Sequence, residues 1–203
     1  MMYSGGYTIT KKKKTDWNQM LIPSAIILIL GSVFIALFLL VPVQEILYKP
    51  EGYWVFEPPK VAYGAFIASL LLIAALLIIY AILISKEKNG KLTKVIMSLA
   101  FAAAIAIGIL SFGQYHYVDK EGIHFNPLFG FQERHYAWSD IEGVKERFKV
   151  KRGVMTSGQM EFTFKDGEEY TILINENVRK AKIAMLFELK KQDIVVERIV
   201  PEE

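Results

Sequence analysis

Three long apolar runs dominate the first half of the chain. No Asp, Glu, Lys or Arg lies between Trp17 and Gln44, from Val61 to Ser85, or from Val95 to Val118. About 20 predominantly apolar residues are enough for a helix to cross the hydrocarbon core of a bilayer. A surface helix of a soluble protein keeps a polar face, whereas these runs are apolar all round. The pattern therefore predicts three transmembrane helices, near residues 20–43, 61–85 and 94–116.

Small residues recur within two of the runs. Ala100, Ala104 and Gly108 are spaced four residues apart in the third run, and Gly64 and Ala68 share this spacing in the second. Small residues on one face let helix backbones approach closely, which predicts a packed three-helix bundle, although Ala and Gly are also simply common in membrane helices. The lack of ionisable residues inside the runs argues against a transporter or channel, because ion paths and proton relays normally need one.

The period of the pattern changes beyond Gln114. Short segments alternate between apolar and polar positions and are bounded by Gly, Asn-Pro or Asp-Gly; they are GIHFNPL, GFQERHYAW, IEGVKERFKVK, QMEFTF and EYTILI. Such alternation is typical of half-buried strands. Asp166-Gly167, between the last two segments, predicts a hairpin turn because such tight turns require positive φ.

A helical period follows the strands. Val178, Ala181, Met185 and Leu189 recur at intervals of three or four residues, which predicts a helix that begins at Asn175 or Asn177 and runs to Gln192. IVVERIV then predicts a final strand. The chain therefore divides into a membrane anchor, residues 1–118, and a small mainly-β domain of six or seven strands with one C-terminal helix, residues 119–203.

The charge of the chain is unevenly distributed. Residues 1–118 hold ten Lys/Arg and five Asp/Glu, and residues 119–203 hold fourteen and sixteen, so the net charge of +3 comes from the flanks of the apolar runs. A nucleic-acid-binding protein would instead show a basic face on its soluble part. The chain has no cysteine, which excludes disulfides, thiolate metal sites and cysteine nucleophiles.

Lysines beside the runs predict the orientation in the membrane. Lys11–Lys14 precede the first run, and four more lysines lie in KEKNGKLTK between the second and third runs. The other loop has only Lys49 and Lys60, diluted by glutamates. Because short cytoplasmic loops are rich in Lys and Arg, we expect a multi-pass cell-membrane protein with a cytoplasmic N-terminus and an extracytoplasmic C-terminal domain. The first run is too long for a signal peptide, and no A-x-A-like cleavage site follows it.

Aromatic residues gather in the loop between the first two runs. Tyr53, Trp54 and Phe56 lie within QEILYKPEGYWVFEPPK. They can form an aromatic belt at the membrane–water interface or cover the soluble domain. We favour the belt.

The segment HYAWSDIEGV raises the question of a catalytic corner. Trp138 has a large apolar body that must pack, and alternation places Tyr136 on its face of the strand. Asp140 is suited to accept hydrogen bonds from backbone N–H groups at a turn. Since no base, nucleophile or metal partner stands at a recognisable spacing, we interpret Trp138 as core and Asp140 as a turn residue.

The second half resembles the bacterial pleckstrin-homology-like (PH-like) domain, in particular its membrane-anchored members. The resemblance covers roughly Gln114 to Val200 and departs from the family in the tail after the helix. It implies a bent, partly open β-barrel closed at one end by the helix, used for binding or scaffolding rather than catalysis. The residues that carry it are Gly122-Ile123, Tyr136, Trp138, Asp140-Ile141, Asp166-Gly167 and the helix after them.

No other motif indicates an enzyme, a metal site or a cofactor site. His116, His124 and His135 have no zinc-ligand spacing, although adjacent strands can bring them together. A nucleophile-elbow pattern and a phosphate-binding Gly-rich loop are both missing from the sequence. We therefore expect no catalytic, cofactor-binding or metal-binding residues.

Cations alternate along VKERFKVKRG. Lys145, Arg147, Lys149 and Lys151 share one parity and Arg152 extends them; we call these five residues the basic stripe. Side chains two apart on a strand project from one face at a spacing of about 6.6 Å. The stripe is our candidate site for an anionic partner such as a lipid headgroup or a wall polymer. The alternative is a solvated strand face whose lysines discourage edge-to-edge pairing.

Together these patterns predict a non-enzymatic integral membrane protein of bacterial type that presents a PH-like binding or scaffolding domain. Its expected partners are the lipid bilayer and another membrane protein or an anionic surface polymer or lipid, and not nucleic acid. A homo-oligomer stays open. Two other functions also stay open: a self-protection factor against membrane-active peptides, a role assigned to resembling proteins, and an accessory subunit of a membrane transporter.

Overall fold

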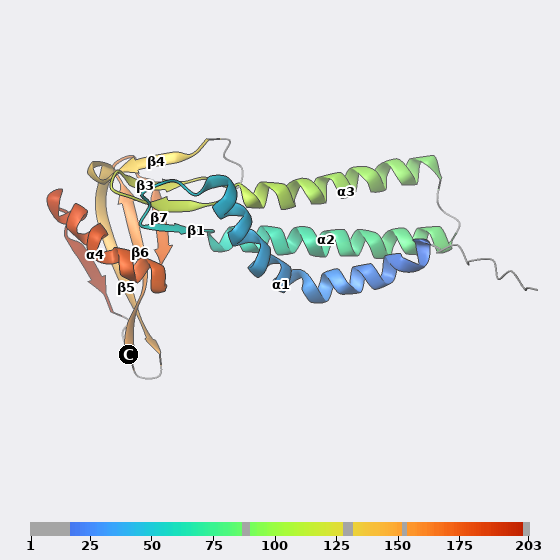
Figure 1. Cartoon of the computed structure of the whole chain (residues 1–203), viewed down its shortest axis with the longest axis horizontal. Helices are drawn as coiled ribbons and strands as arrows, with labels where there is room; N and C mark the ends of the chain where they lie inside the picture. The colour runs from blue at the N-terminus through green and yellow to red at the C-terminus, as the bar shows by residue number, and fades with distance from the viewer. Residues whose placement is uncertain (1–16, 87–89, 128–131, 152–153, 201–203) are drawn as a thin grey trace, which may run out of the picture.

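Three long helices form one half of the molecule. The computed structural model describes residues 17–86, 90–127, 132–151 and 154–200. After a 3-10 turn at Trp17–Met20, the helices are α1 (Leu21–Tyr48), α2 (Lys60–Ser85) and α3 (Lys91–Phe112). All three are long and apolar enough to cross a membrane, which confirms the predicted spans. They run side by side, and the β region lies at one end of them (Figure 1).

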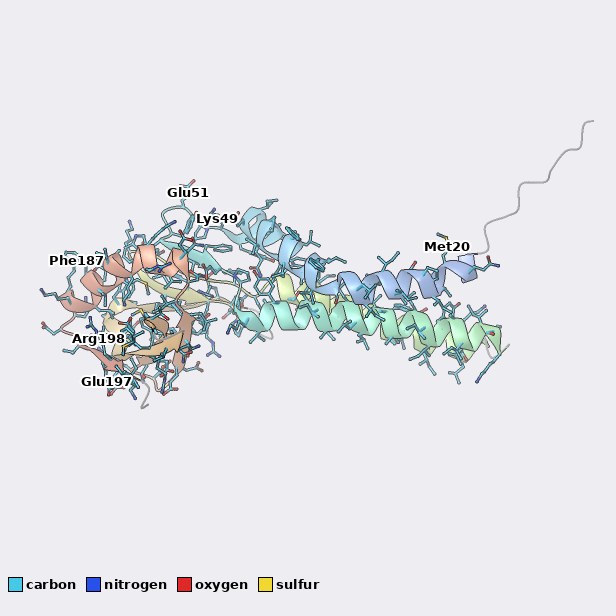
Figure 2. All side chains as sticks on the ribbon, turned by 90° about the horizontal axis from the view of Figure 1, so that it is seen from below. Met20, Lys49, Glu51, Phe187, Glu197 and Arg198 are labelled. Carbon is cyan, nitrogen blue, oxygen red and sulfur yellow. The ribbon has the colours of Figure 1, made fainter. Side chains whose placement is uncertain are left out.

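The chain enters and leaves the β region repeatedly. α1 starts at the far end, beside Met20, and reaches the β region near Lys49 and Glu51 (Figure 2). α2 runs back to the far end and α3 returns, so the end of α2, the start of α3 and the start of α1 share the end away from the β region (Figure 1).

The helices form a row with α2 in the middle. α2 packs along both neighbours, whereas α1 and α3 meet little. Pro42 lies inside α1, where it cannot donate a backbone hydrogen bond, and the last turns of α1 bend across toward α3 (Figure 1). The predicted bundle is thus a layer in which α1 and α3 approach each other only near the β region.

Small residues mediate the contact between α2 and α3, as predicted for the third span. Ala104 and Gly108 are buried, and the Ser69 hydroxyl of α2 donates a hydrogen bond of 2.8 Å to the Ala104 carbonyl. The matching prediction for the second span is wrong: Gly64 and Ala68 are exposed, and Ala62, Phe66 and Ser69 are buried in their place. Small-residue spacing by itself does not say which face finds a partner.

The β region consists of two four-stranded sheets. Sheet A has the order β1-β2-β3-β4 and is antiparallel throughout; sheet B has the order β7-β6-β5-β8, with β8 parallel to β5. The strands of sheet A are β1 (Val55–Glu57), β2 (His116–Val118), β3 (Gly122–Phe125) and β4 (Arg134–Ala137). Those of sheet B are β5 (Ile141–Lys151), β6 (Val154–Phe164), β7 (Glu169–Leu173) and β8 (Val196–Ile199).

Most of the predicted elements are found where the pattern placed them. β5 coincides with IEGVKERFKVK, the hairpin at Asp166-Gly167 is confirmed with Gly167 at φ 82°, and α4 (Glu176–Lys191) is capped by the Asn175 side chain. The described chain has eight strands rather than six or seven. The difference arises because the loop between α1 and α2 and the residues directly after α3 contribute β1 and β2.

The loop aromatics belong to the β domain, so the preferred belt interpretation is wrong. Trp54 packs against the domain core and stacks on Trp138 with ring centroids 5.9 Å apart. Phe56 is buried with Tyr115 and Tyr117, and Tyr53 packs against this group. The alternative, in which these residues cover the domain, is the one observed.

One core lies between the two sheets and α4. It takes Val118 and Ile123 from sheet A, Phe162 from sheet B and Met185 from α4. Trp138 belongs to it and is 4% exposed, as predicted. The segment Trp138–Asp140 is a short 3-10 turn in which Asp140 accepts a hydrogen bond of 3.1 Å from the Ala137 N–H, which confirms Asp140 as a turn residue.

A buried carboxylate fixes α4 over sheet B. Glu146 of β5 is 1% exposed and accepts hydrogen bonds from Lys182 of α4 and from the Ser157 hydroxyl of β6. Burial opposes the ionisation of Glu146, but the bonds from Lys182 and Ser157 outweigh it and lower the pKa of Glu146. A buried charge of this kind is tolerated only with such partners.

Replacing Gly108 tests the α2–α3 contact. A Cβ at Gly108 would lie 2.8 Å from the Ser69 hydroxyl oxygen, whereas a Cβ at Gly64 meets nothing within 4 Å. We expect Gly108→Val to destabilise the purified protein by about 1–3 kcal/mol, the usual effect of overpacking. Gly64→Val is the matched control and should leave thermal unfolding in detergent nearly unchanged. Equal effects of the two substitutions would contradict the observed helix contact.

Candidate functional site

A cleft of about 690 Å³ opens where the helices meet the β domain. α1 and α2 form one wall, and β1, β2, β7 and the start of α4 form the other. Its lining residues are Val41, Glu45, Phe56, Glu57, Pro58, Pro59, Lys60, Val61, Tyr63, His116, Tyr170, Thr171, Leu173, Asn175 and Asn177.

The cleft is the membrane-side end of the space between the two sheets. Glu57 and His116 are direct partners in the β1–β2 pair, as are Val55 and Val118 two residues away. Since side chains two apart share a face, Glu57 and His116 project to the same side as the core residues Val55 and Val118. The core therefore ends in polar groups at the point where the helices begin.

Glu57 is held in place by amides. The side-chain NH₂ group of Asn175 donates to both carboxylate oxygens of Glu57, each at 2.6 Å, and the side-chain NH₂ group of Asn177 donates to Glu57 Oε1 at 3.2 Å. Asn175 also caps α4 by accepting from the Val178 N–H at 3.0 Å. The start of α4 and the end of β1 are thus joined through one carboxylate.

His116 is buried in the wall of the cleft. It is 5% exposed, and neither ring nitrogen has a hydrogen-bond partner among the described residues. Its ring meets Tyr170 edge-on at 5.8 Å. Burial lowers the pKa of His116 to about 4, so the imidazole is neutral near pH 7.

The opposite face of sheet A carries a second polar cluster. The Glu133 carboxylate accepts from the Tyr115 and Tyr117 hydroxyls at 2.7 and 2.8 Å and lies 3.1 Å from His124 Nδ1. Burial opposes the ionisation of Glu133, but these hydrogen bonds outweigh it and lower the pKa of Glu133. The cluster ties the residues before β4 onto the aromatic face of β2.

Two of the three histidines meet, as adjacent strands allow. His124 and His135 stack with centroids 4.2 Å apart, and His116 lies on the other face of the sheet. Within the described ranges no group of three or more His, Asp or Glu side chains is arranged to hold a metal ion.

The basic stripe lies on an exposed face of sheet B that also carries acids. Lys145, Arg147 and Lys149 are exposed. Arg147 donates to Glu161 of β6 at 2.5 Å and holds the pKa of Glu161 below its usual range. Lys145 stands opposite Glu161 on β6 and Glu197 on β8.

The end of the stripe is not described. Lys151 is the last residue of β5, and the structure describes its backbone only. Arg152 lies outside the described residues. Whether the stripe binds an anion stays a prediction.

Patterns within single segments of the sequence do not predict the cleft. Its residues come from six separate elements, and in the sequence Glu57, Lys60 and Asn175 stand out only as loop charges and a helix cap. One local feature pointed toward it: YWVFE alternates like a strand and is bounded by Pro58-Pro59.

The burial of His116 predicts a pH dependence. Because its pKa in the folded protein, about 4, lies below the ordinary 6.5, its contribution to stability is complete above pH 6.5 and is lost as the pH falls toward 4. We expect the wild type to lose about 3 kcal/mol more than His116→Phe over this interval. Thermal unfolding of the full chain at several pH values measures the difference. Phe125→Leu changes the same core without a titratable group, so it should lower the free energy of unfolding equally at the high-pH and low-pH ends of this range. If His116→Phe and the wild type lose stability in parallel as the pH falls, the pH dependence does not come from His116.

Comparisons of the chain with protein-family models, with curated proteins and with solved structures found no match in any of the three. The function is therefore inferred from the membrane helices, the sheets and the chemistry of the cleft.

Proposed function

We propose that the chain is a non-enzymatic integral membrane protein whose β domain is a binding or scaffolding module held at the membrane surface. The observation that carries this proposal is the shared construction of the cleft by α1, α2 and the β domain. A ligand in the cleft would touch the membrane anchor and the domain at once.

The domain is fixed to its anchor rather than tethered by a linker. Gln44 of α1 donates to the Gln114 carbonyl just before β2 at 2.5 Å, and Tyr48 stacks on Tyr115 at 4.9 Å. β1 is hydrogen-bonded to β2 between two membrane helices. These contacts would hold the cleft at a fixed height relative to a bilayer.

The length of α1 supports a position of the cleft near the boundary of the hydrocarbon core. α1 has 28 residues, which at 1.5 Å per residue gives about 42 Å, longer than the roughly 30 Å of hydrocarbon. Its last turns, with Glu45, then extend into the head-group region. Val41 on α1 and Val61 on α2 line the side of the cleft nearer the bilayer.

We propose that the domain is PH-like. What supports this is the strand meander, the core Trp138, the hairpin at Asp166-Gly167 and the helix that packs on the same core. β1, supplied by the helical half, and β8, parallel to β5, are additions to what the resemblance implies.

The lysine distribution supports an extracytoplasmic β domain. The end of α2, followed by Lys86, and the start of α3, with Lys91 and Lys94, lie at the end away from the β region together with the start of α1 (Figure 1). Short basic segments stay cytoplasmic, which would place the cleft at the outer surface.

Cysteine labelling tests the orientation, since the natural chain has no cysteine. Val195, 84% exposed, lies before β8, and Lys91 is exposed at the start of α3. In intact cells a membrane-impermeant thiol reagent should label Val195→Cys, and it should label Lys91→Cys only after lysis. The reverse pattern would place the β domain in the cytoplasm.

Filling the cleft tests the binding function. Val61, 61% exposed in the wall of the cleft, can become Trp without entering the core. Native mass spectrometry of the full chain released in mild detergent should show one retained membrane amphiphile, with occupancy at least about tenfold lower in Val61→Trp, equivalent to ~1.4 kcal/mol.

Val33→Trp is the matched control, because Val33 is 49% exposed on α1 and lies outside the cleft. It should retain the amphiphile like the wild type. Equal retention by Val61→Trp and Val33→Trp would contradict a function for the cleft.

A further inference from the structure

The cleft contains charges of both signs. Glu57 contributes a carboxylate, and Glu45 contributes a second one whose Oε1 accepts a hydrogen bond of 3.3 Å from Lys49. Lys60, the first residue of α2, contributes an ammonium group. A ligand that matches this lining must itself carry both a cation and an anion.

Glu57 forms no salt bridge with a cation among the described residues. Its hydrogen bonds come from the neutral amides of Asn175 and Asn177. A carboxylate has about four lone-pair positions, so Glu57 can accept further hydrogen bonds. The two asparagines fix its orientation in advance. Such a group suits a donor cation with N–H bonds better than a quaternary ammonium, which has none.

The start of α2 provides the complementary end. No side chain caps its first turn, whose backbone N–H groups and dipole favour an anion, and Lys60 stands at the same place. Lys60 takes part in no salt bridge within the described ranges. A second observation points the same way: His116, opposite Glu57 in the strand pair, is 5% exposed with both ring nitrogens unpartnered in the described part of the chain. A neutral imidazole has one N–H to donate.

On the two helices the lining beyond the charged groups is mostly apolar, apart from the phenol of Tyr63. Val41 and Val61 flank the cleft on the two helices, and Pro58 and Pro59 line the passage between β1 and α2. Acyl chains can follow the helices from this point while the polar groups stay at the cleft.

We propose that the cleft binds the head group of a zwitterionic phospholipid with a primary ammonium, which donates to Glu57 and Glu45 while the phosphate faces Lys60 and the start of α2. This inference rests on the proposed binding function. It names the chemistry of the ligand that such a module would hold at the membrane surface.

The test is a native mass-spectrometry titration of the full chain with phosphatidylethanolamine, phosphatidylcholine and phosphatidylglycerol of identical acyl chains. We expect phosphatidylethanolamine to bind at least about tenfold more tightly than the other two, because phosphatidylcholine lacks N–H donors and phosphatidylglycerol lacks the cation. Glu57→Gln and Glu45→Gln should each reduce this preference. Glu45→Gln changes an exposed position on α1 and leaves the amide contacts of Glu57 intact.

Glu51→Gln is the matched control. Glu51 is exposed in the loop after α1, beyond Lys49 and outside the lining of the cleft, and its substitution should leave the preference unchanged (Figure 2). Lys60→Ala should weaken all three phospholipids, since each carries the phosphate.

The outcomes separate the inference from the proposed function. Equal binding of the three lipids, still lost in Val61→Trp, would overturn the head-group assignment and leave the binding function standing. If no lipid is retained by the wild type, the binding function fails as well. Soluble glycerophosphoethanolamine should compete at least about a hundredfold more weakly than the lipid; equal competition would overturn the assignment to a membrane lipid.

Discussion

The pairing of β1 with β2 is the contact on which the rest of the structure depends. Three residues of the loop between α1 and α2 lie in register with three residues that follow α3, and the Trp54 N–H donates to the Val118 carbonyl at 2.7 Å. This pairing completes sheet A and places Val55 in the core. It also fixes the distance between the end of α1, the start of α2 and the end of α3. The cleft exists because these helix ends are held beside the open end of the core.

Hydrogen bonds of Gln44 hold the same junction from the helical side. Its buried side-chain NH₂ group donates to the Ser111 and Gln114 carbonyls at 3.3 and 2.5 Å, whereas its Oε1 has no partner among the described residues. The last carbonyls of a helix have no partner within the helix, so a side chain that reaches them stabilises its end. An unpaired buried polar group costs about 1–3 kcal/mol, which makes this crossing a specific attachment of α1 to α3. The bend at Pro42 turns α1 in the direction that this contact requires.

Local periodicity predicted the elements, whereas contacts between distant segments decided the site. The three spans, β5, the hairpin and α4 follow from patterns within one segment, and their boundaries agree closely with the structure. β1 was missed because Trp54 and Phe56 suit an interface belt and a strand equally well, and the partner that decides between them lies some sixty residues away. The same limit applies to Gly64, whose spacing is identical to that of Gly108 but which has no helix facing it.

Neighbouring strands decide whether a charged side chain is paired within the protein or available to a ligand, as the basic stripe and the cleft show. Parity predicts correctly that Lys145, Arg147 and Lys149 are exposed, yet β6 and β8 place Glu161 and Glu197 beside the first two of them. Exposed pairs of this kind contribute little to stability, and they lower the attraction of the face for an anion. Glu57 is the opposite case, since folding surrounds it with amides and brings it no cation within the described chain. An acid held by neutral amides has no cation of the described chain beside it, and this makes the cleft, more than the stripe, the place where the fold prepares an electrostatic contact with a ligand.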